Sequence, residues 1–417
     1  MIRNFLHRVL KRTFILGSLE LVDADGVSHH LGDGSGPHVR VRFTSHRAER
    51  GVLLDPEMKL GEEYVDGGYV IEEGTVFDFL SILLRNVGDS GRTSWTKAAA
   101  GLRNAFRRFA DNNDPTRARA NVHHHYDLDG RLYNLFLDSD MQYSCGYFGP
   151  GVTSIEEAQL AKKKHIAAKL DLRPGQRILD IGSGWGGLGL YLAEQFDVDV
   201  TGVTLSDEQY RVSNERAKQR GLTDQVRFLL KDYRELDQKW DRIVSVGMFE
   251  HVGLSRYGEF FRQVDALLAP DGVALLHTIA KYKGPGPISA WIERYIFPGS
   301  YLPTLSELAP VIEKQGLWLT DLEVLRLHYA ETLAAWNRRF QARRAEAARI
   351  YDERFCRMWE FYLQLCEVAF RGMTLCVFQL QLTKDIGALP ITRDYMLDTE
   401  RRLVTPTNLR SVAGTRG

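Results

Sequence analysis

A run of glycines directly follows a short apolar segment near the middle of the chain. Residues 178–181 (ILDI) have the pattern of a buried strand, and residues 182–187 (GSGWGG) lead into an apolar periodic segment, 188–196, that predicts a helix. A loop without Cβ atoms can turn tightly and bring backbone N–H groups against a ligand, and the following helix N-terminus favours an anionic group. Alone, the pattern is equally compatible with a plain strand-to-helix turn.

Three further strand ends carry groups that a nucleotide-like cofactor would need. Residues 203–206 (VTLS) lack the acid that dinucleotide enzymes place against a ribose, so Asp180 and the Gln209 amide would share that contact. Asp232 follows the next strand and could accept a hydrogen bond from the exocyclic amine of adenine, while Glu250 follows a fourth strand. A glycine loop with no ribose acid, but with an acid after the third strand, favours S-adenosylmethionine over NAD.

Strand and helix patterns alternate throughout the region that carries these groups. The predicted strands are 178–181, 198–203, 226–230, 242–246 and, after a turn at 270–272, 273–278, with helices at 132–137, 155–172, 188–196, 206–219 and 257–268. Long helices are expected over 338–378, and the last strands from Gln379 onward and at 391–392. The alternation predicts an α/β fold with a doubly wound parallel sheet, whose ligands bind at the carboxyl ends of the strands.

Composition limits the classes of protein to which the chain can belong. With 417 residues it should form two or three domains, and its 54 Lys and Arg balance its 54 Asp and Glu, so net charge favours no nucleic-acid partner. No apolar run approaches the roughly 18 residues of a membrane span, so a cytoplasmic protein is expected. Four cysteines, Cys145, Cys356, Cys366 and Cys376, lack metal-ligand spacing and are interpreted as reduced thiols.

The N-terminal region has a different pattern. Residues 14–74 alternate short apolar runs with glycine-containing turns, which predicts strands and hairpins, and 74–86 predicts a helix with Thr75 as N-cap. Before them, one helical face of residues 2–10 is apolar and the other basic, typical of a helix on an anionic membrane surface and equally of a helix packed on its own domain. The apolar face consists of Ile2, Phe5, Leu6, Val9 and Leu10.

A change of composition separates the two regions. Residues 88–121 mix small, polar and basic residues and are interpreted as a linker with one basic helix. Three consecutive histidines, 123–125, follow it, but consecutive side chains cannot all point one way, so they are not expected to share a metal ion. No metal site is predicted elsewhere.

Several short motifs are specific in combination. They are HYD at 125–127, MQYSC at 141–145, LDIG at 179–182, WGG at 185–187, VTLS at 203–206, DRIVSVGMFEHVG at 241–253, LHTI at 276–279 and YIFPG at 295–299. Over roughly 122–378 the chain thereby resembles the cyclopropane-fatty-acyl-phospholipid synthase family, which includes the mycolic acid cyclopropane synthases; the N-terminal region matches more loosely. The resemblance implies a Rossmann-like class I methyltransferase and a homodimer.

The resemblance also implies a reaction and its residues. A methylene group would pass from S-adenosylmethionine to the cis double bond of an unsaturated acyl chain in a membrane phospholipid, through a carbocation that a bound bicarbonate deprotonates before the ring closes. The implied bicarbonate cage is Cys145, Glu250, His277, the backbone N–H of Ile279, and Tyr329. The implied cofactor residues are Tyr143, Ser144, Asp180, Gly182, Gly184, Thr204, Leu205, Gln209, Asp232 and Tyr233.

Other interpretations stay open from the sequence. Cys145 and His277 also suit an apolar core, and Glu250 could orient His277 or a water, or act electrostatically on the cation. Ser183 and Gly146 replace the cysteine and alanine of many relatives, which leaves the acyl-chain preference open. The alternative function is a related fatty-acyl methyltransferase that gives a methyl-branched or methylene product without closing a ring. A nucleic-acid methyltransferase and a lipid-binding protein with a relic site are less favoured.

These expectations give a division of the chain. Residues 1–110 are predicted to form a lipid-engaging α+β domain, 111–121 a linker, and 122–417 the S-adenosylmethionine-dependent methyltransferase domain. The partner is expected to be a phospholipid bilayer, with the cytoplasmic protein bound peripherally to the inner face of the membrane.

Overall fold

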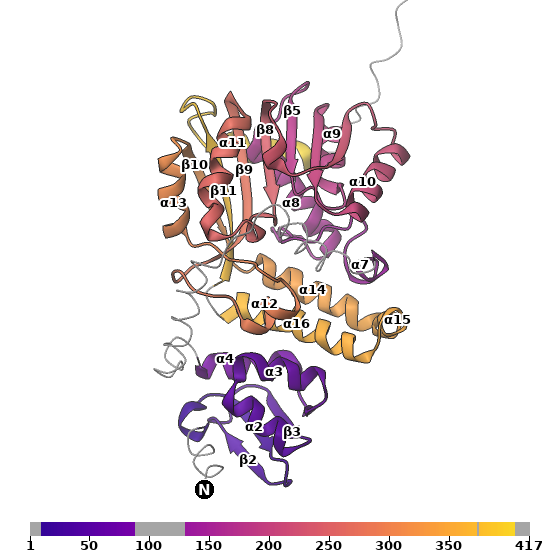
Figure 1. Cartoon of the computed structure of the whole chain (residues 1–417), viewed down its shortest axis with the longest axis vertical. Coiled ribbons are helices and arrows are strands. Elements are labelled where there is room, and N and C mark those ends of the chain that lie inside the picture. The colour runs from indigo at the N-terminus through magenta and orange to yellow at the C-terminus, as the bar shows by residue number, and fades with distance from the viewer. Residues whose placement is uncertain (1–9, 88–129, 373–374, 405–417) are drawn as a thin grey trace, which may run out of the picture.

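The structure, a computed structural model, describes residues 10–87, 130–372 and 375–404. Two sheets lie at opposite ends of an elongated molecule, with a layer of helices between them (Figure 1). The histidines at 123–125, the proposed linker and most of the predicted N-terminal helix lie outside the described residues. No described helix is long and apolar enough to cross a membrane.

The N-terminal unit is a small α+β structure with its own core. Its sheet has the order β2-β1-β3-β4, and β1 runs parallel to β3. The strands are β1 (Ser18–Val22), β2 (Ser28–Leu31), β3 (His38–Phe43) and β4 (Tyr69–Glu73), and the helices are α2 (His46–Leu54), α3 (Pro56–Val65) and α4 (Val76–Val87). Strands within the range predicted for them, 14–74, and the helix predicted at 74–86 are confirmed.

Helices α2 and α3 correct the prediction of strands and hairpins throughout 14–74. Each begins at a residue suited to that position: the Ser45 side chain accepts from Ala48 N at 3.2 Å, and Asp55 caps α3 with Pro56 at its first turn. Gly61 lies within α3, and the Trp291 indole packs against it, 2.4 Å from where a Cβ would lie. The glycine therefore serves packing between distant segments.

The larger sheet has seven strands in the order β10-β11-β9-β8-β5-β6-β7. Its strands are β5 (Arg177–Ile181), β6 (Asp199–Thr204), β7 (Val226–Leu230), β8 (Trp240–Val246), β9 (Leu268–Lys281), β10 (Trp318–Leu325) and β11 (Leu375–Thr383). Strands β5 to β9 pair in parallel, whereas β11 is antiparallel to both β9 and β10. The sheet is thus mixed, and the predicted parallel pairing holds for the five adjacent strands from β9 to the edge strand β7.

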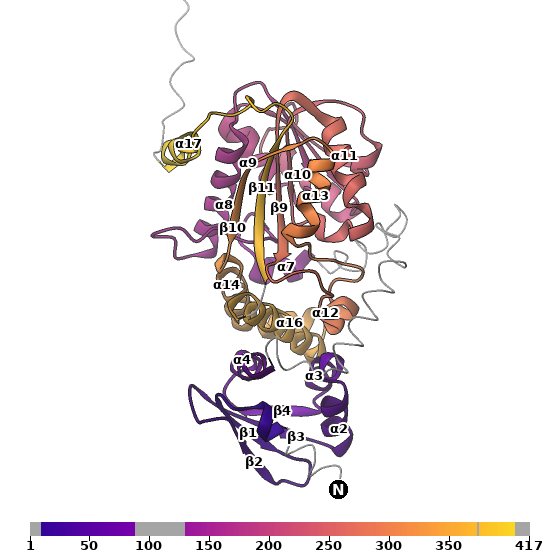
Figure 2. The ribbon, with the colours of Figure 1, turned by 90° about the vertical axis from the view of Figure 1, so that its left-hand side faces the viewer.

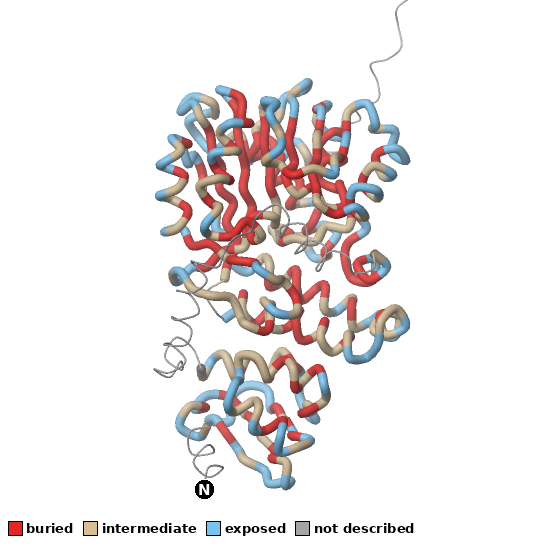
Figure 3. Tube along the Cα trace, in the orientation of Figure 1, coloured by how far each residue is buried: buried red, intermediate tan, exposed pale blue. Residues whose placement is uncertain are grey.

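Helices cover both faces of this sheet, as a doubly wound fold requires (Figure 2). One core cluster contains residues of α8 (Ile155–Leu170), α9 (Gly187–Phe196) and α10 (Asp207–Gln219), and another contains residues of α11 (Tyr257–Leu267) and α13 (Leu305–Lys314). The last described helix, α17 (Asp394–Val404), packs against α8. Figure 3 shows buried residues concentrated along the strands between these layers.

The middle layer of helices joins the two sheets. It contains α7 (Gly130–Phe136), α12 (Ala290–Tyr295), α14 (His328–Ala342), α15 (Arg344–Ile350) and α16 (Glu353–Gly372). Helix α16 contacts α3 and α4 of the N-terminal unit, and Phe77 N donates to Gln364 Oε1 at 2.7 Å. The side chains of this layer form a large aromatic and aliphatic cluster.

Some predicted boundaries are wrong. Residues 270–272, predicted as a turn, lie within β9, where its register against β8 shifts. Residues 391–392 form no strand, and the predicted long helices end at Gly372, before β11 begins at Leu375. Strand β10 and helices α12 and α13 were not predicted.

Candidate active site

A cavity lies at the carboxyl ends of β5, β6, β7 and β8, where the strand order reverses and the connections on either side diverge. Every residue predicted to hold the cofactor lines it. These are Tyr143, Ser144, Asp180, Gly182, Gly184, Thr204, Leu205, Gln209, Asp232 and Tyr233. Further lining residues that the sequence did not single out include Met141, Gln142, Met248 and Arg256.

The glycine loop is held in place by its backbone. Gly182 N and Ser183 N both donate to Val203 O at 3.0 Å, which fixes the loop to the end of β6. Gly182 has a φ of 81°, and a Cβ there would lie 2.6 Å from Met248 Cβ. Both the turn and this close approach therefore require glycine, so the wall of the cavity at this point is bare backbone.

The next two strand ends carry polar groups that already have partners. Thr204 Oγ1 donates to Gln209 Oε1 at 2.7 Å, and both residues are buried. Asp232 accepts from Arg234 Nε at 2.9 Å and Nη2 at 2.6 Å, a bidentate pair that fixes the carboxylate. Asp180 is 2% exposed, and its burial raises its pKa to about 7. These side chains are preorganised before a ligand arrives.

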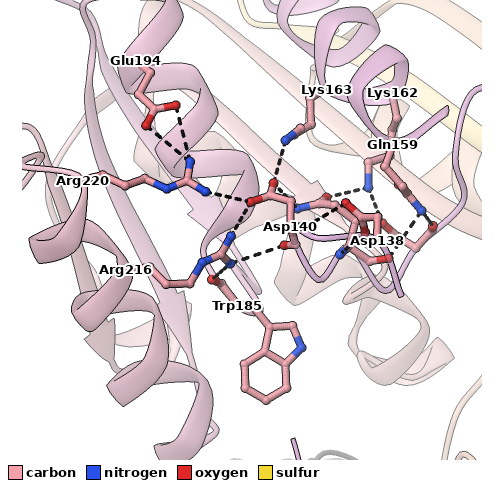
Figure 4. Close-up of polar contacts among 11 residues, drawn as sticks. Asp138, Asp140, Gln159, Lys162, Lys163, Trp185, Glu194, Arg216 and Arg220 are labelled. Atoms are coloured by element: carbon pink, nitrogen blue, oxygen red, sulfur yellow. Dashed lines mark hydrogen bonds and ion pairs between the residues drawn. The ribbon is translucent and has the colours of Figure 1, made fainter. Parts of the chain in front are cut away.

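A buried ion cluster that the sequence did not reveal holds the segment carrying Tyr143 and Ser144. Asp140 accepts from Lys163 Nζ at 2.6 Å and from Arg220 at 3.3 Å, and it also pairs with Arg216 (Figure 4). Arg216 donates in addition to Trp185 O in the glycine loop. Because the cations come from α8 and α10, the cluster fixes this segment against two helices and the loop.

Glu250 and Ile279 of the predicted cage are in direct contact. Glu250 Oε1 accepts from Ile279 N at 2.6 Å, so the backbone donor that was predicted for the bicarbonate is occupied by the carboxylate. The second oxygen, Oε2, is buried and has no hydrogen-bond partner among the described residues. Burial raises the pKa of Glu250 to about 7, which keeps part of the population protonated at neutral pH.

His277 lies on the same strand, two residues before Ile279, and is 1% exposed. Its Nδ1 faces Gln379 Nε2 at 3.1 Å; in this orientation the amide donates, so the proton lies on Nε2. That atom also has no hydrogen-bond partner among the described residues. Burial lowers the pKa of His277 to about 3, so the ring is neutral and can donate one hydrogen bond.

Cys145 and Tyr329 of the predicted cage lie outside the lining of the cavity. Cys145 is 1% exposed, and burial raises the pKa of its thiol well above the ordinary value. Gly146 N donates to Thr332 Oγ1 at 2.9 Å, which ties the Cys145 segment to α14, the helix that carries Tyr329. Cys145 belongs to the aromatic cluster, against which Ile279 and Tyr329 also pack. The other cysteines are free thiols, and two of them, Cys356 and Cys376, are buried as predicted.

Two buried atoms without partners, Glu250 Oε2 and His277 Nε2, are of the kinds that a small hydroxylated oxyanion could satisfy. A neutral imidazole N–H donates to an oxyanion, and a carboxylate oxygen accepts from its hydroxyl group. His277 and Glu250 supply these two functions, so the residues present fit a bicarbonate. Among the described residues, no group of His, Cys, Asp and Glu could hold a metal ion.

The mixed sheet with one antiparallel strand next to its edge, the glycine loop at the reversal of strand order and the acid after β7 define a Rossmann-like methyltransferase. The family model for mycolic acid cyclopropane synthetase matches residues 113–380, more than half of the chain. The chain belongs to the cyclopropane-fatty-acyl-phospholipid synthase and mycolic acid cyclopropane synthase family of S-adenosylmethionine-dependent methyltransferases, as the sequence motifs predicted.

Individual relatives match most of the chain. The cyclopropane-fatty-acyl-phospholipid synthase of Escherichia coli is 39% identical over 367 residues, covering 88% of this chain and 92% of that protein. The tuberculostearic acid methyltransferase UfaA1 of Mycobacterium tuberculosis is 32% identical over 394 residues, covering 91% of each. The solved structure of mycolic acid cyclopropane synthase CmaA1, complexed with SAH and CTAB, is 35% identical with a TM-score of 0.61, covering 63% of this chain and 97% of that one.

Proposed function

We propose that the protein transfers a methylene group from S-adenosylmethionine to the cis double bond of an unsaturated acyl chain in a phospholipid and closes a cyclopropane ring. The observation that carries the proposal is the pair of buried, unpartnered atoms Glu250 Oε2 and His277 Nε2. Keeping such atoms costs free energy unless a ligand pairs with them, so they indicate a site that is built for a small polar group.

The cofactor cavity and the aromatic cluster share part of their walls. Tyr143 and Trp185 line the cavity and also pack in the cluster, where the Tyr143 ring lies 5.2 Å from that of Trp336. Tyr143 O–H and Tyr362 O–H are hydrogen-bonded at 2.8 Å. An acyl chain within this cluster would reach the cofactor without crossing water, which would otherwise quench a carbocation. Aromatic faces also attract positive charge as it develops.

The two absent groups would supply an electrophilic methyl on a sulfonium and an oxyanion base. The chain's own residues bind and orient: the glycine loop and Ser144 would hold the cofactor, and His277 would donate Nε2–H to the oxyanion. Glu250, fixed by Ile279 N–H, would present Oε2 to the hydroxyl of the oxyanion and contribute negative charge near the cation. Cys145 and Tyr329 would complete the cage. Since an alkene is a weak nucleophile, alignment with the methyl must supply much of the rate.

A second candidate function is methylation of the same double bond without ring closure. It is favoured by the 32% identity to a relative named as a tuberculostearic acid methyltransferase. Both reactions share the cofactor and the carbocation, and they differ in where the proton is lost.

Incubation of the purified protein with S-adenosylmethionine and vesicles of an unsaturated phospholipid separates the two. We expect fatty esters heavier by one CH₂, with cyclopropane proton resonances by NMR. Proton NMR is essential because a methylene-branched product has the same mass as the cyclopropane. A product with olefinic protons would support the second candidate, and the absence of any product would contradict both.

We further propose that the protein acts at the inner surface of the membrane, with the N-terminal unit facing the lipid. The basic face predicted for residues 2–10 supports this, because it suits anionic headgroups. The homodimer implied by the family stays a prediction, to be measured by light scattering.

A further inference from the structure

Lys162 is a buried cation immediately behind the cofactor cavity. It lies on α8 and is 1% exposed, and its ammonium donates to Ser144 Oγ and to Gln142 Oε1, both at 2.7 Å. Gln159, one turn earlier on α8, donates to Ser144 O at 2.9 Å (Figure 4). Helix α8 therefore contacts both the side chain and the backbone of Ser144. Both acceptors of the Lys162 ammonium line the cavity.

Lys162 differs from the other buried lysines of α8 in having no counter-ion. Lys163 pairs with Asp140 at 2.6 Å and Lys169 with Glu323 at 2.6 Å, whereas no carboxylate of the described residues lies within 4.0 Å of the Lys162 ammonium. Burying a charge without a partner is costly, because the charge loses its hydration. A charge kept in this state beside a ligand cavity indicates that the ligand supplies the opposite charge.

The hydroxyl of Ser144 can transmit this charge. Its oxygen accepts from Lys162, which leaves the O–H free to donate into the cavity. The glycine loop adjoins the same segment, since a Cβ on Gly187 would lie 2.4 Å from Gln142 Nε2. Asp232, predicted to bind adenine, instead follows β7 at the edge of the sheet. In S-adenosylmethionine the anionic group is the α-carboxylate of the amino-acid end, opposite the adenine.

We propose that Lys162 is a positioning residue that supplies the counter-charge for the α-carboxylate of the cofactor through Ser144 and Gln142. The inference rests on the proposed use of S-adenosylmethionine and names how its amino-acid end is recognised. Burial lowers the pKa of Lys162 to about 8, opposed by Asp138, Cys145 and Asp140, so the ammonium is still mostly charged at pH 7. An arriving carboxylate would stabilise that charge.

Calorimetric binding of two ligands to the full-length protein tests the proposal. S-adenosylhomocysteine carries the α-carboxylate, and 5′-methylthioadenosine lacks the entire amino-acid end. In Lys162→Met we expect the Kd of S-adenosylhomocysteine to rise by at least about tenfold, the size expected for loss of a charge-assisted contact. The Kd of 5′-methylthioadenosine should stay within about twofold of the unmodified protein's. Lys164→Met, on the same helix, is the matched control and should change neither Kd.

Three outcomes would count against the proposal or its basis. Equal weakening of both ligands would mean that the lysine only supports the wall of the cavity, and unchanged binding of both would remove its role altogether; either overturns the inference. Failure of the unmodified protein to bind S-adenosylhomocysteine would instead overturn the proposed function. If Lys162→Met does not fold, Ser144→Ala removes the hydroxyl that accepts from the ammonium and donates to the ligand, and it should weaken S-adenosylhomocysteine selectively by a fewfold factor.

Discussion

The cofactor cavity and the predicted oxyanion cage share one edge of the sheet, but their polar groups are treated in opposite ways. In the cavity, Thr204 is bonded to Gln209 and Asp232 to Arg234, so these groups are paired before a ligand binds. In the cage, Glu250 Oε2 and His277 Nε2 are buried without partners. The polar groups of the cofactor cavity are thus satisfied without a ligand, whereas those of the cage need a bound group to be satisfied.

This difference shows which region lowers the free energy of unfolding. A paired polar group costs little when it is buried, whereas an unpaired one costs about 1–3 kcal/mol. The cavity can therefore be stable on its own, while the cage keeps an unfavourable arrangement that only a ligand relieves. Substitutions in the two regions should consequently separate binding of the cofactor from turnover.

Glu250→Gln should show the largest effect. The amide keeps the shape of the side chain but removes the negative charge, so we expect turnover to fall by about 10²–10³-fold, as for loss of one preorganised electrostatic group. The Kd of S-adenosylhomocysteine, measured by calorimetry, should stay within about twofold because Glu250 does not line the cavity. Normal turnover in this variant would refute the cage.

Acid should lower activity through the same residue. Because burial raises the pKa of Glu250 to about 7, the carboxylate is neutral below that pH and charged above it. We expect kcat/KM to fall by about tenfold for each pH unit below this value, measured at a fixed bicarbonate concentration. In Glu250→Gln the fall should become shallower without vanishing, because Asp180, whose pKa burial also raises to about 7, would still titrate near this pH; an unchanged profile would contradict the role of Glu250.

The same shift has a consequence for stability with the opposite sign. The folded-state pKa of Glu250 lies above its ordinary value of 4.5, so its favourable contribution is present at low pH and is lost as pH rises through about 7. At pH 8 the buried charge should cost about 3 kcal/mol. Glu250→Gln should therefore raise the free energy of unfolding at pH 8, as measured in urea, while it lowers turnover.

Asp140→Asn should act on the other region and more weakly. The carboxylate joins Lys163, Arg216 and Arg220, so its loss leaves the buried Lys163 and the partly buried Arg216 without their counter-ion and loosens the segment that carries Tyr143 and Ser144. We expect the Kd of S-adenosylhomocysteine to rise by roughly tenfold and the unfolding free energy to fall by about 3 kcal/mol. Glu194→Gln, at the exposed end of the same network, is the control and should change little. A turnover defect without weaker binding would contradict the division between the two regions.

Sequence reasoning located the strand ends well because the determinants there are local. The glycine loop and the alternation of apolar strands and helices depend on neighbouring residues, and the observed cavity contains every predicted cofactor residue. The residues of the cage were predicted from the family resemblance of the motifs, not from hydrophobic periodicity. Its internal contact differs from the prediction: the Ile279 N–H holds Glu250.

What could not be predicted depends on contacts between distant segments. Arg216 and Asp140 meet only because α10 and the 138–142 turn fold onto the same loop, and a basic residue in an exposed-looking helix gives no sign of this. Lys162 lies in a run of three lysines, so nothing local shows which of them is buried without a carboxylate partner. In the same way, the packing of Trp291 against Gly61 joins residues far apart in the chain, so no local pattern indicates it.

Helix α16 connects the N-terminal unit to the wall of the cofactor cavity. Its Tyr362 is bonded to Tyr143 at the wall of the cavity, while Phe361, the preceding residue, packs against Tyr64 of the N-terminal unit at 5.7 Å between ring centroids. Without that unit, the face of α16 that contacts α3 and α4 would be exposed to water, while Tyr362 of the same helix holds Tyr143 at the cavity. We therefore expect loss of the N-terminal unit to lower the free energy of unfolding and to disturb the position of Tyr143.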